Sequence, residues 1–146
     1  MRPAQRPGKP TLGGCIGMQV LPASADEAPG GPGLGIPDGR VRRLPDTEGK
    51  VPHMGWNILE PVTAGVAPSA LLAGVPPASH VYYVHSFALV PDRYTLDTSR
   101  HGMPFAAALR AGNPVAVRAH PEKRRAVGAT VQTKTVGELE GAWERA

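Results

Sequence analysis

The sequence predicts an α/β protein of one domain, and three stretches support this class. A short strand is expected over residues 9–13, and the Gly-rich turn that follows leads into a helix expected over residues 16–23. Residues 80–87 are rich in β-branched and aromatic side chains and lie between proline-containing segments, which is typical of a strand. A short terminal helix is expected over residues 137–145, where apolar side chains recur four residues apart.

The composition indicates a loop-rich chain with a thin core. Of the 146 residues, 18 are glycine and 17 are proline, which is about twice the usual share. Hydrophobic residues make up 41% of the chain and aromatic residues 5%, so little apolar surface is available for burial. Glycine and proline are dense over residues 26–38, where we expect a surface loop.

Charge and cysteine content limit the partners that we expect. The net charge is +4, but the 16 lysines and arginines are scattered, apart from small clusters at residues 40–43 and 123–125. Nucleic-acid binding needs a longer basic stripe, so no nucleic-acid partner is expected. No apolar run is long enough to span a bilayer, and the N-terminus does not look like a secretion signal. One cysteine excludes an internal disulfide and fits a reducing compartment, so we expect a cytoplasmic protein without a membrane partner.

The remaining elements follow from shorter patterns. Residues 39–44 alternate apolar and basic side chains, which predicts an edge strand. Residues 69–74 are expected to form one helical turn that a glycine closes. Residues 105–109 and 115–117 are expected to pair as a hairpin around a turn at residues 111–113. Residues 124–135 predict no regular element.

A loop is expected over residues 51–57, which combine histidine, methionine, tryptophan and asparagine between two weak strands. Such a mixture is typical of a contact surface. The alternative is that Met54 and Trp56 fill a small satellite core, because large side chains pack more often than they recognise a partner.

The turn around Cys15 has the spacing of a nucleophile elbow. Gly13 and Gly17 stand two residues to either side of the cysteine, where a sharp strand-to-helix turn leaves no room for a β-carbon. A thiol in this position would point away from the sheet edge and be available for attack. The alternative is a buried, inert cysteine beside a Gly-rich turn.

A cysteine nucleophile needs a general base, and His120 with Glu122 supplies a candidate pair. His120 follows the last predicted strand, and a carboxylate two residues later can hold one nitrogen of its ring while the other faces Cys15. Four other histidines compete for this role, and a lone histidine is most often a surface or structural residue. They are His53, His80, His85 and His101.

Four motifs occur in the order found in class I glutamine amidotransferases. They are GGCIGMQ at residues 13–19, PHMGWN at 52–57, YYVHSF at 82–87 and HPEK at 120–123. The chain therefore resembles this family, and the middle two motifs are closest to the glutaminase subunit of imidazole glycerol phosphate synthase.

This resemblance implies a domain organisation. It covers residues 9–123, which would form a partial amidotransferase domain with a flavodoxin-like α/β sheet that lacks the N-terminal strands. An irregular lead-in is expected over residues 1–8 and a divergent tail over residues 124–146.

The resemblance also implies an activity. Glutamine would be hydrolysed by a triad of Cys15, His120 and Glu122, with the backbone N–H of Ile16 donating to the oxyanion. The substrate glutamine would be held by Gln19, His85, Ser86 and Phe87. No cofactor or metal is expected.

A partner is implied as well. Ammonia would pass to a (β/α)₈-barrel cyclase that makes imidazole glycerol phosphate in histidine biosynthesis. The segment that faces the cyclase would be His53, Met54, Gly55, Trp56 and Asn57.

The chain departs from the family pattern just before His120. The family has Gln-Phe where this chain has Arg118-Ala119, and loss of a buried aromatic side chain costs about 3–5 kcal/mol of stability. An alternative function is therefore an inactive, truncated remnant that at most binds the cyclase partner.

Overall fold

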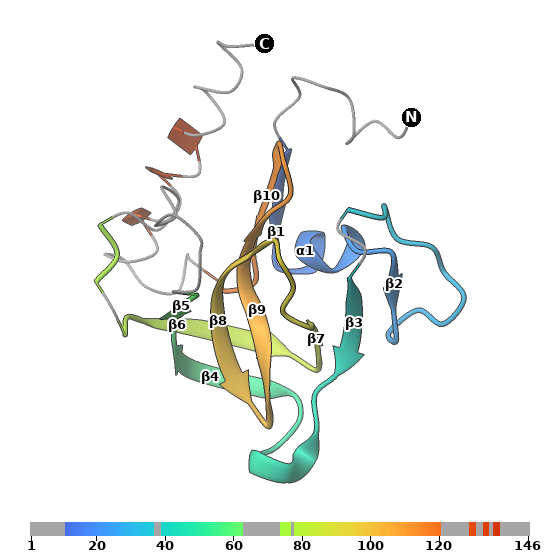
Figure 1. The fold of residues 1–146 in the computed structure, drawn as a ribbon. Helices are drawn as coiled ribbons and strands as arrows, with labels where there is room; N and C mark the ends of the chain where they lie inside the picture. The colour runs from blue at the N-terminus through green and yellow to red at the C-terminus, as the bar shows by residue number, and fades with distance from the viewer. Residues whose placement is uncertain are drawn as a thin grey trace.

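The computed structural model describes residues 11–36, 39–62, 74–76, 78–120, 129–130, 133–134 and 136–137. Within this part of the chain, strands dominate and group into three sheets, and the short helix α1 (Ile16–Val20) packs beside them (Figure 1). No helix among the described residues is long and apolar enough to cross a membrane.

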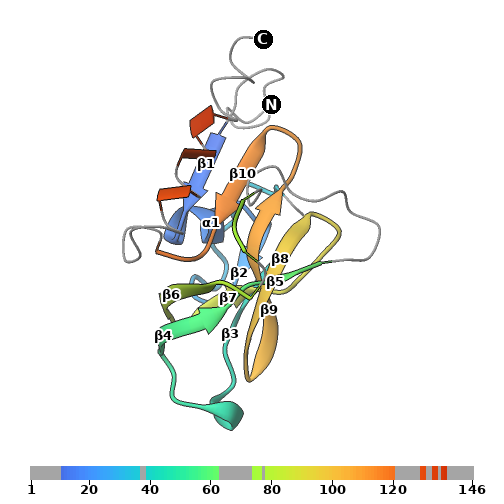
Figure 2. The same ribbon diagram turned by 90° about the vertical axis from the view of Figure 1, so that its left-hand side faces the viewer.

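The largest sheet contains five strands in the order β1-β10-β9-β8-β5. β1 pairs with β10 in parallel, and the other neighbours pair antiparallel. Figures 1 and 2 show β8 and β9 as a long twisted hairpin at the centre of the molecule. The strands are β1 (Thr11–Gly14), β5 (Glu60–Pro61), β8 (Thr95–His101), β9 (Met103–Arg110) and β10 (Pro114–Val117).

Two smaller sheets complete the described strands. One has the order β2-β3-β7, and the other is the antiparallel pair β4-β6, which lies across β8 (Figure 1). The strands are β2 (Ser24–Ala25), β3 (Arg40–Arg43), β7 (Phe87–Leu89), β4 (His53–Ile58) and β6 (His80–His85). The helical elements with defined bounds are α1 (Ile16–Val20) and the 3₁₀ helix η2 (Asp46–Glu48).

The core fills the space between these sheets. β9 is buried on both faces over residues 105–109, because its side chains belong to two core clusters: one with α1, β3 and β7, the other with β6. Its three successive alanines let neighbouring backbones approach closely. The fully buried aromatic side chains Tyr83 and Phe105 meet edge to face, 5.2 Å between ring centroids. A second cluster packs Met18 of α1 against Leu109.

Several predicted elements are confirmed. The strand before Cys15 is present as β1, and the predicted hairpin is formed by β9 and β10 around Gly112 at φ +72°. The loop predicted over residues 26–38 has no regular element in its described part, residues 26–36. The predicted strand 80–87 exists but breaks at Ser86, so that β6 ends before it and β7 begins after it.

Other predictions are corrected. Residues 39–44 do not form an edge strand, since β3 lies between β2 and β7. Residues 53–58 form a strand rather than a loop, because pairing with β6 outweighs the local effect of Pro52 and Gly55. The helix after Cys15 ends at Val20, before the proline at position 22.

Predictions for the end of the chain are tested only at a few positions. Residues 129–130 and 133–134, for which no regular structure was expected, are helical. Gly137 is helical as predicted, whereas residues 138–145 of the predicted terminal helix lie outside the described residues. The predicted helical turn is described only at Gly74.

Candidate active site at the ends of β1 and β10

Parallel pairing of β1 with β10 places the two halves of the candidate site at one sheet edge. Gly14 is opposite Val117, so the residues that follow both strands lie side by side. The backbone N–H of Cys15 donates to the Val117 carbonyl at 2.9 Å, which extends the ladder to the turn. Residues 118–120 therefore come close to Cys15 although they are about a hundred positions away in the sequence.

Cys15 has the strained backbone expected of an elbow. Its φ of +50° and ψ of −108° are unusual for a residue with a side chain, and such strain is found most often at functional sites. A β-carbon on Gly13 would lie 3.0 Å from the backbone of Gly17 and 3.1 Å from the β-carbon of Ala116. A β-carbon on Gly17 would meet nothing within 4 Å among the described residues. The predicted crowding therefore applies at Gly13 and not at Gly17.

The structure brings His120 to Cys15, as the sequence predicted. Nε2 of His120 lies 3.2 Å from Sγ of Cys15, and the cysteine is half-buried rather than enclosed. The backbone N–H of His120 donates to the Tyr82 carbonyl at 2.9 Å, which fixes the histidine against β6. A nucleophile and a general base in this contact can transfer a proton. Glu122 lies outside the described residues.

A second donor reaches the same sulfur. Nη1 of Arg118 lies 3.2 Å from Sγ of Cys15, and Nη2 donates to the Phe87 carbonyl at 3.3 Å. Arg118 is 4% exposed. Burial lowers the pKa of Arg118 from its ordinary value, and the attraction to Cys15 opposes this shift. The guanidinium remains a cation, because its ordinary pKa is far above neutrality.

The Phe87 carbonyl joins the predicted substrate residues. It accepts from Nε2 of Gln19 at 3.2 Å and is 3.0 Å from Nδ1 of His85, in addition to the Arg118 contact. Gln19 is buried and also donates to a carboxylate oxygen of Glu27 at 3.2 Å. Gln19, His85 and Phe87 therefore converge on one point beside Cys15, together with Glu27.

His85 is paired on both sides of its ring. Nδ1 donates to the Phe87 carbonyl, so Nε2 acts as the acceptor for Nδ1–H of His53, 3.0 Å away. Burial, then the charge of Arg118, lowers the pKa of His85 to about 3. Burial, then the neighbouring His101, lowers the pKa of His53 to about 4. Both rings are therefore neutral near pH 7, and they connect β4 to the Phe87 carbonyl.

The segment predicted to face a partner lies on β4, whose side chains point alternately to the interior and to the surface. Met54 and Trp56 are 63% and 50% exposed, so they do not fill a satellite core. His53 is 6% exposed, and Gly55 and Asn57 are half-buried. Asn57 donates to the Arg100 carbonyl at 2.7 Å. The exposed face continues with Ile58 and with Val84 of β6.

Ile16 begins α1 directly after Cys15, the position expected for the predicted oxyanion donor, and its side chain is 64% exposed. The first N–H groups of a helix have no partner within the helix, so they are available to an oxygen atom. Ser86 lies between β6 and β7, and its carbonyl accepts from the backbone N–H of Leu44 at 2.8 Å.

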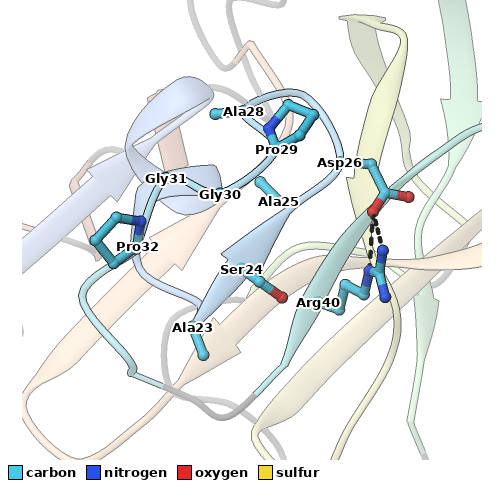
Figure 3. Close-up of a pocket in the computed structure, with 10 residues that line it drawn as sticks. All are labelled: Ala23, Ser24, Ala25, Asp26, Ala28, Pro29, Gly30, Gly31, Pro32 and Arg40. Atoms are coloured by element: carbon cyan, nitrogen blue, oxygen red, sulfur yellow. Dashed lines mark hydrogen bonds and ion pairs between the residues drawn. The ribbon is translucent and has the colours of Figure 1, made fainter.

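Among the described residues, two depressions lie next to the loop after α1. The larger one, about 640 Å³, is lined by small residues of the segment 23–32 and by the ion pair of Arg40 with Asp26 (Figure 3). The smaller one, about 250 Å³, includes Gln19 in its wall. Of the described residues that approach the sulfur, neither Cys15 nor His120 lines either depression. The candidate site is therefore described by its side-chain contacts.

Sequence reasoning missed two residues of this cluster. Glu27 belongs to a Gly- and Pro-rich loop whose path cannot be read from its sequence. Arg118 stands out in the sequence only as a departure from the family pattern. Its position, two residues before His120 and next to the last strand, is the signal that could have identified it.

Comparisons with known proteins give sequence relatives that share one name. No family model matches the chain. The chain is 47% identical over 128 residues to the imidazole glycerol phosphate synthase subunit HisH of Deinococcus radiodurans, covering 86% of this chain and 58% of that protein. It is 36% identical over 135 residues to the HisH subunit of Mannheimia succiniciproducens, covering 92% of this chain and 67% of that protein. The chain thus spans about three fifths of the length of the curated relatives that it matches.

Solved structures with a similar fold agree with the predicted α/β class. A putative GMP synthase subunit from Thermoplasma acidophilum aligns with a TM-score of 0.63 at 17% identity, over 93% of this chain and 60% of that one. A crystal structure described as a glutamine amidotransferase aligns with a TM-score of 0.58, also at 17% identity, over 88% of this chain and 60% of that one. At this identity the likeness shows the fold, which is that of the class I amidotransferases predicted from the motifs.

Proposed function

The chain belongs to the family of HisH subunits of imidazole glycerol phosphate synthase, and on this basis we propose that it hydrolyses glutamine and delivers the ammonia to a cyclase subunit. The observation that carries the proposal is the contact between Sγ of Cys15 and Nε2 of His120 at 3.2 Å, on an elbow with strained backbone. A thiol held against an imidazole by two paired strands is the arrangement that acyl transfer requires.

The proposed reaction begins with attack of the Cys15 sulfur on the side-chain amide carbon of glutamine. The carbonyl oxygen becomes an oxyanion, which the N–H of Ile16 stabilises. His120, which holds the proton taken from the thiol, gives it to the leaving nitrogen. The carbon–nitrogen bond of the tetrahedral intermediate then breaks, so that ammonia leaves and a thioester to Cys15 remains. His120 then takes a proton from water, the hydroxide attacks the thioester, and glutamate is released with the thiol restored. Glu122 is proposed to orient His120.

The substrate is proposed to lie against the cluster at the Phe87 carbonyl. Free glutamine carries an ammonium group, so its site needs a negatively charged acceptor. Glu27 supplies a carboxylate, which the Gln19 amide holds at 3.2 Å. Because both ring nitrogens of His85 are engaged within the protein, that residue acts by fixing the backbone of Ser86 and Phe87.

The partner is proposed to be a cyclase subunit with a (β/α)₈-barrel, with which the chain forms a heterodimer. Met54, Trp56, Ile58 and Val84 present an apolar face on the pair β4-β6, and exposed aromatic and methionine side chains are enriched at protein interfaces. The thiol that the mechanism needs fits a reducing cytoplasm, in which we place the reaction.

The test is a glutaminase assay on the full chain, with and without the cyclase of the same synthase. We expect release of glutamate that falls by about 10³-fold or more in Cys15→Ala, because removal of a nucleophile abolishes the acyl transfer. Arg93→Gln, on an exposed loop, is the matched control and is expected to retain activity.

The same assay decides between the enzyme and the binding-only alternative. Cyclase binding without release of glutamate at any protein concentration would support a non-catalytic remnant. Equal release from the wild-type chain and Cys15→Ala would show that the glutamate comes from another source, and the proposal would fail.

A further inference from the structure

Arg118 contacts the Sγ atom of Cys15, which is the attacking atom of the proposed reaction, although none of the proposed steps uses Arg118. Its guanidinium and the imidazole of His120 approach Sγ of Cys15 at the same distance, 3.2 Å. The backbone N–H of Arg118 donates to the Ala107 carbonyl at 2.8 Å, which fixes the residue at the end of the five-stranded sheet. The side chain that contacts the sulfur therefore extends from a backbone position fixed by a hydrogen bond.

The guanidinium also has donors that the protein does not fully use. Nε of Arg118 is buried and has no hydrogen-bond partner among the described residues. Nη2 shares the Phe87 carbonyl with Gln19 and His85, although a carbonyl oxygen has only two lone pairs. A buried donor left in this state is costly, and an anionic group that reached the guanidinium would offset that cost.

We propose that Arg118 is a positioning residue that holds Sγ of Cys15 opposite His120 and attracts negative charge to the reacting atom. The inference deepens the proposed hydrolysis of glutamine and rests on it only for the effect on turnover. A charged hydrogen bond fixes the sulfur more firmly than a neutral one, and a fixed cation stabilises an anionic sulfur. It also attracts a carboxylate in the place that the amide of the substrate occupies.

The groups around Arg118 modulate this effect without cancelling it. His120 faces the sulfur from the other side, and His85 is neutral near pH 7 because its pKa is lowered. Glu27 is an acidic side chain close enough to influence Arg118. The Tyr83 hydroxyl, which is also close enough, is neutral near pH 7 because burial raises its pKa well above the ordinary value. His120 is present in the wild-type chain and in Arg118→Gln alike, so the difference between the two proteins reports the charge of Arg118.

The test compares two alkylating reagents at the single cysteine. Iodoacetate is an anion and iodoacetamide is neutral, so the ratio of their rate constants reports the local charge, while the ionisation of the thiol affects both alike. We expect the ratio to fall about fivefold in Arg118→Gln, the factor that corresponds to about 1 kcal/mol of attraction between unit charges about 4 Å apart in water. Arg118→Lys should restore most of the ratio, and Arg93→Gln should leave it unchanged.

The wild-type chain gives a result even if Arg118→Gln does not fold. Its iodoacetate-to-iodoacetamide ratio is expected to exceed that of N-acetylcysteine, and to fall to that value in denaturant. A native ratio at or below that of the free thiol, or an unchanged ratio in folded Arg118→Gln, would overturn the proposal. A merely structural role for Arg118 would alter both rate constants together.

The enzymatic consequence is tested separately. Glutamate, the product, carries a carboxylate where glutamine has its amide, so glutamate should inhibit wild type more strongly than Arg118→Gln. A chain that is inactive, but whose alkylation ratio falls in folded Arg118→Gln, would reject the proposed function and keep the role of Arg118. An active chain whose alkylation ratio is not raised would keep the proposed function and reject the role of Arg118.

Discussion

Gly13 is the residue at which the turn before Cys15 depends on a missing side chain. An ideal β-carbon there would meet the backbone carbon and oxygen of Gly17 at 3.0 Å, and backbone atoms in a paired strand and a helix cannot move away cheaply. Gly13→Ala is therefore expected to lower the free energy of unfolding by about 1–3 kcal/mol and to displace Cys15 from His120. Urea denaturation and the rate of alkylation by iodoacetamide measure the two effects.

Gly14 provides the matched control, because a β-carbon on it would meet nothing within 4 Å among the described residues. Gly14→Ala changes the same strand by the same methyl group and should change the urea midpoint little. If both alanine variants are equally stable, the close approach of Gly17 to Gly13 does not constrain the turn.

At the scale of an element, β4 is a strand that local sequence patterns do not predict. Residues 53–58 contain a glycine and follow a proline, which locally favours a loop. The strand forms because all six residues pair with β6, from His53 opposite His85 to Ile58 opposite His80. That pairing partner lies more than twenty positions away, so no local pattern reveals it.

In the candidate site too, some features could be predicted from nearby sequence, and others depend on pairing between strands far apart in the chain. Cys15 and His120 were predictable because each follows a strand and their residue types have complementary chemistry. The parallel pairing of β1 with β10, which makes them neighbours, could not be read from either strand. The contacts of Arg118 and Glu27 depend on that pairing and on the path of a Gly-rich loop, so they required the structure.

The exposed face of β4 yields a prediction at this scale. Trp56 is 50% exposed and meets Tyr82 edge to face, 5.3 Å between ring centroids, so the protein itself covers it only in part. Trp56→Ser is expected to weaken binding of the cyclase by about 2 kcal/mol, which is about 30-fold in Kd, because interface tryptophans often dominate binding energy. Isothermal titration calorimetry with the cyclase measures the change.

Leu12 supplies the control for this surface, since it is another exposed apolar residue, at 44%, but lies on β1 of a different sheet. Leu12→Ser should leave the affinity for the cyclase unchanged. A cyclase affinity that responds equally to both substitutions would mean that the pair β4-β6 is not the docking face.

At the scale of the whole molecule, buried ionisable groups make the stability depend on pH. His53 and His85 have lowered pKa values of about 4 and about 3, so the folded chain binds their protons only in strong acid. Asp97 on β8 is 5% exposed, and burial raises its pKa to about 6. On acidification the two histidines therefore lower the stability of the fold, whereas Asp97 raises it.

The signs give a net loss of stability between pH 7 and pH 5. The two histidines contribute stability that is fully present above pH 6.5 and is lost as the unfolded chain takes up protons, about 2 kcal/mol each at pH 5. Protonation of Asp97 below pH 6 offsets about 1–2 kcal/mol of this. We expect a net loss of about 2–3 kcal/mol, measured as the change in urea midpoint. Asp97→Asn should raise stability at pH 7 and deepen the loss on acidification, whereas His85→Gln should reduce that loss. Stability that stays level or rises from pH 7 to pH 5 would show that the two histidines are not held neutral in the folded chain.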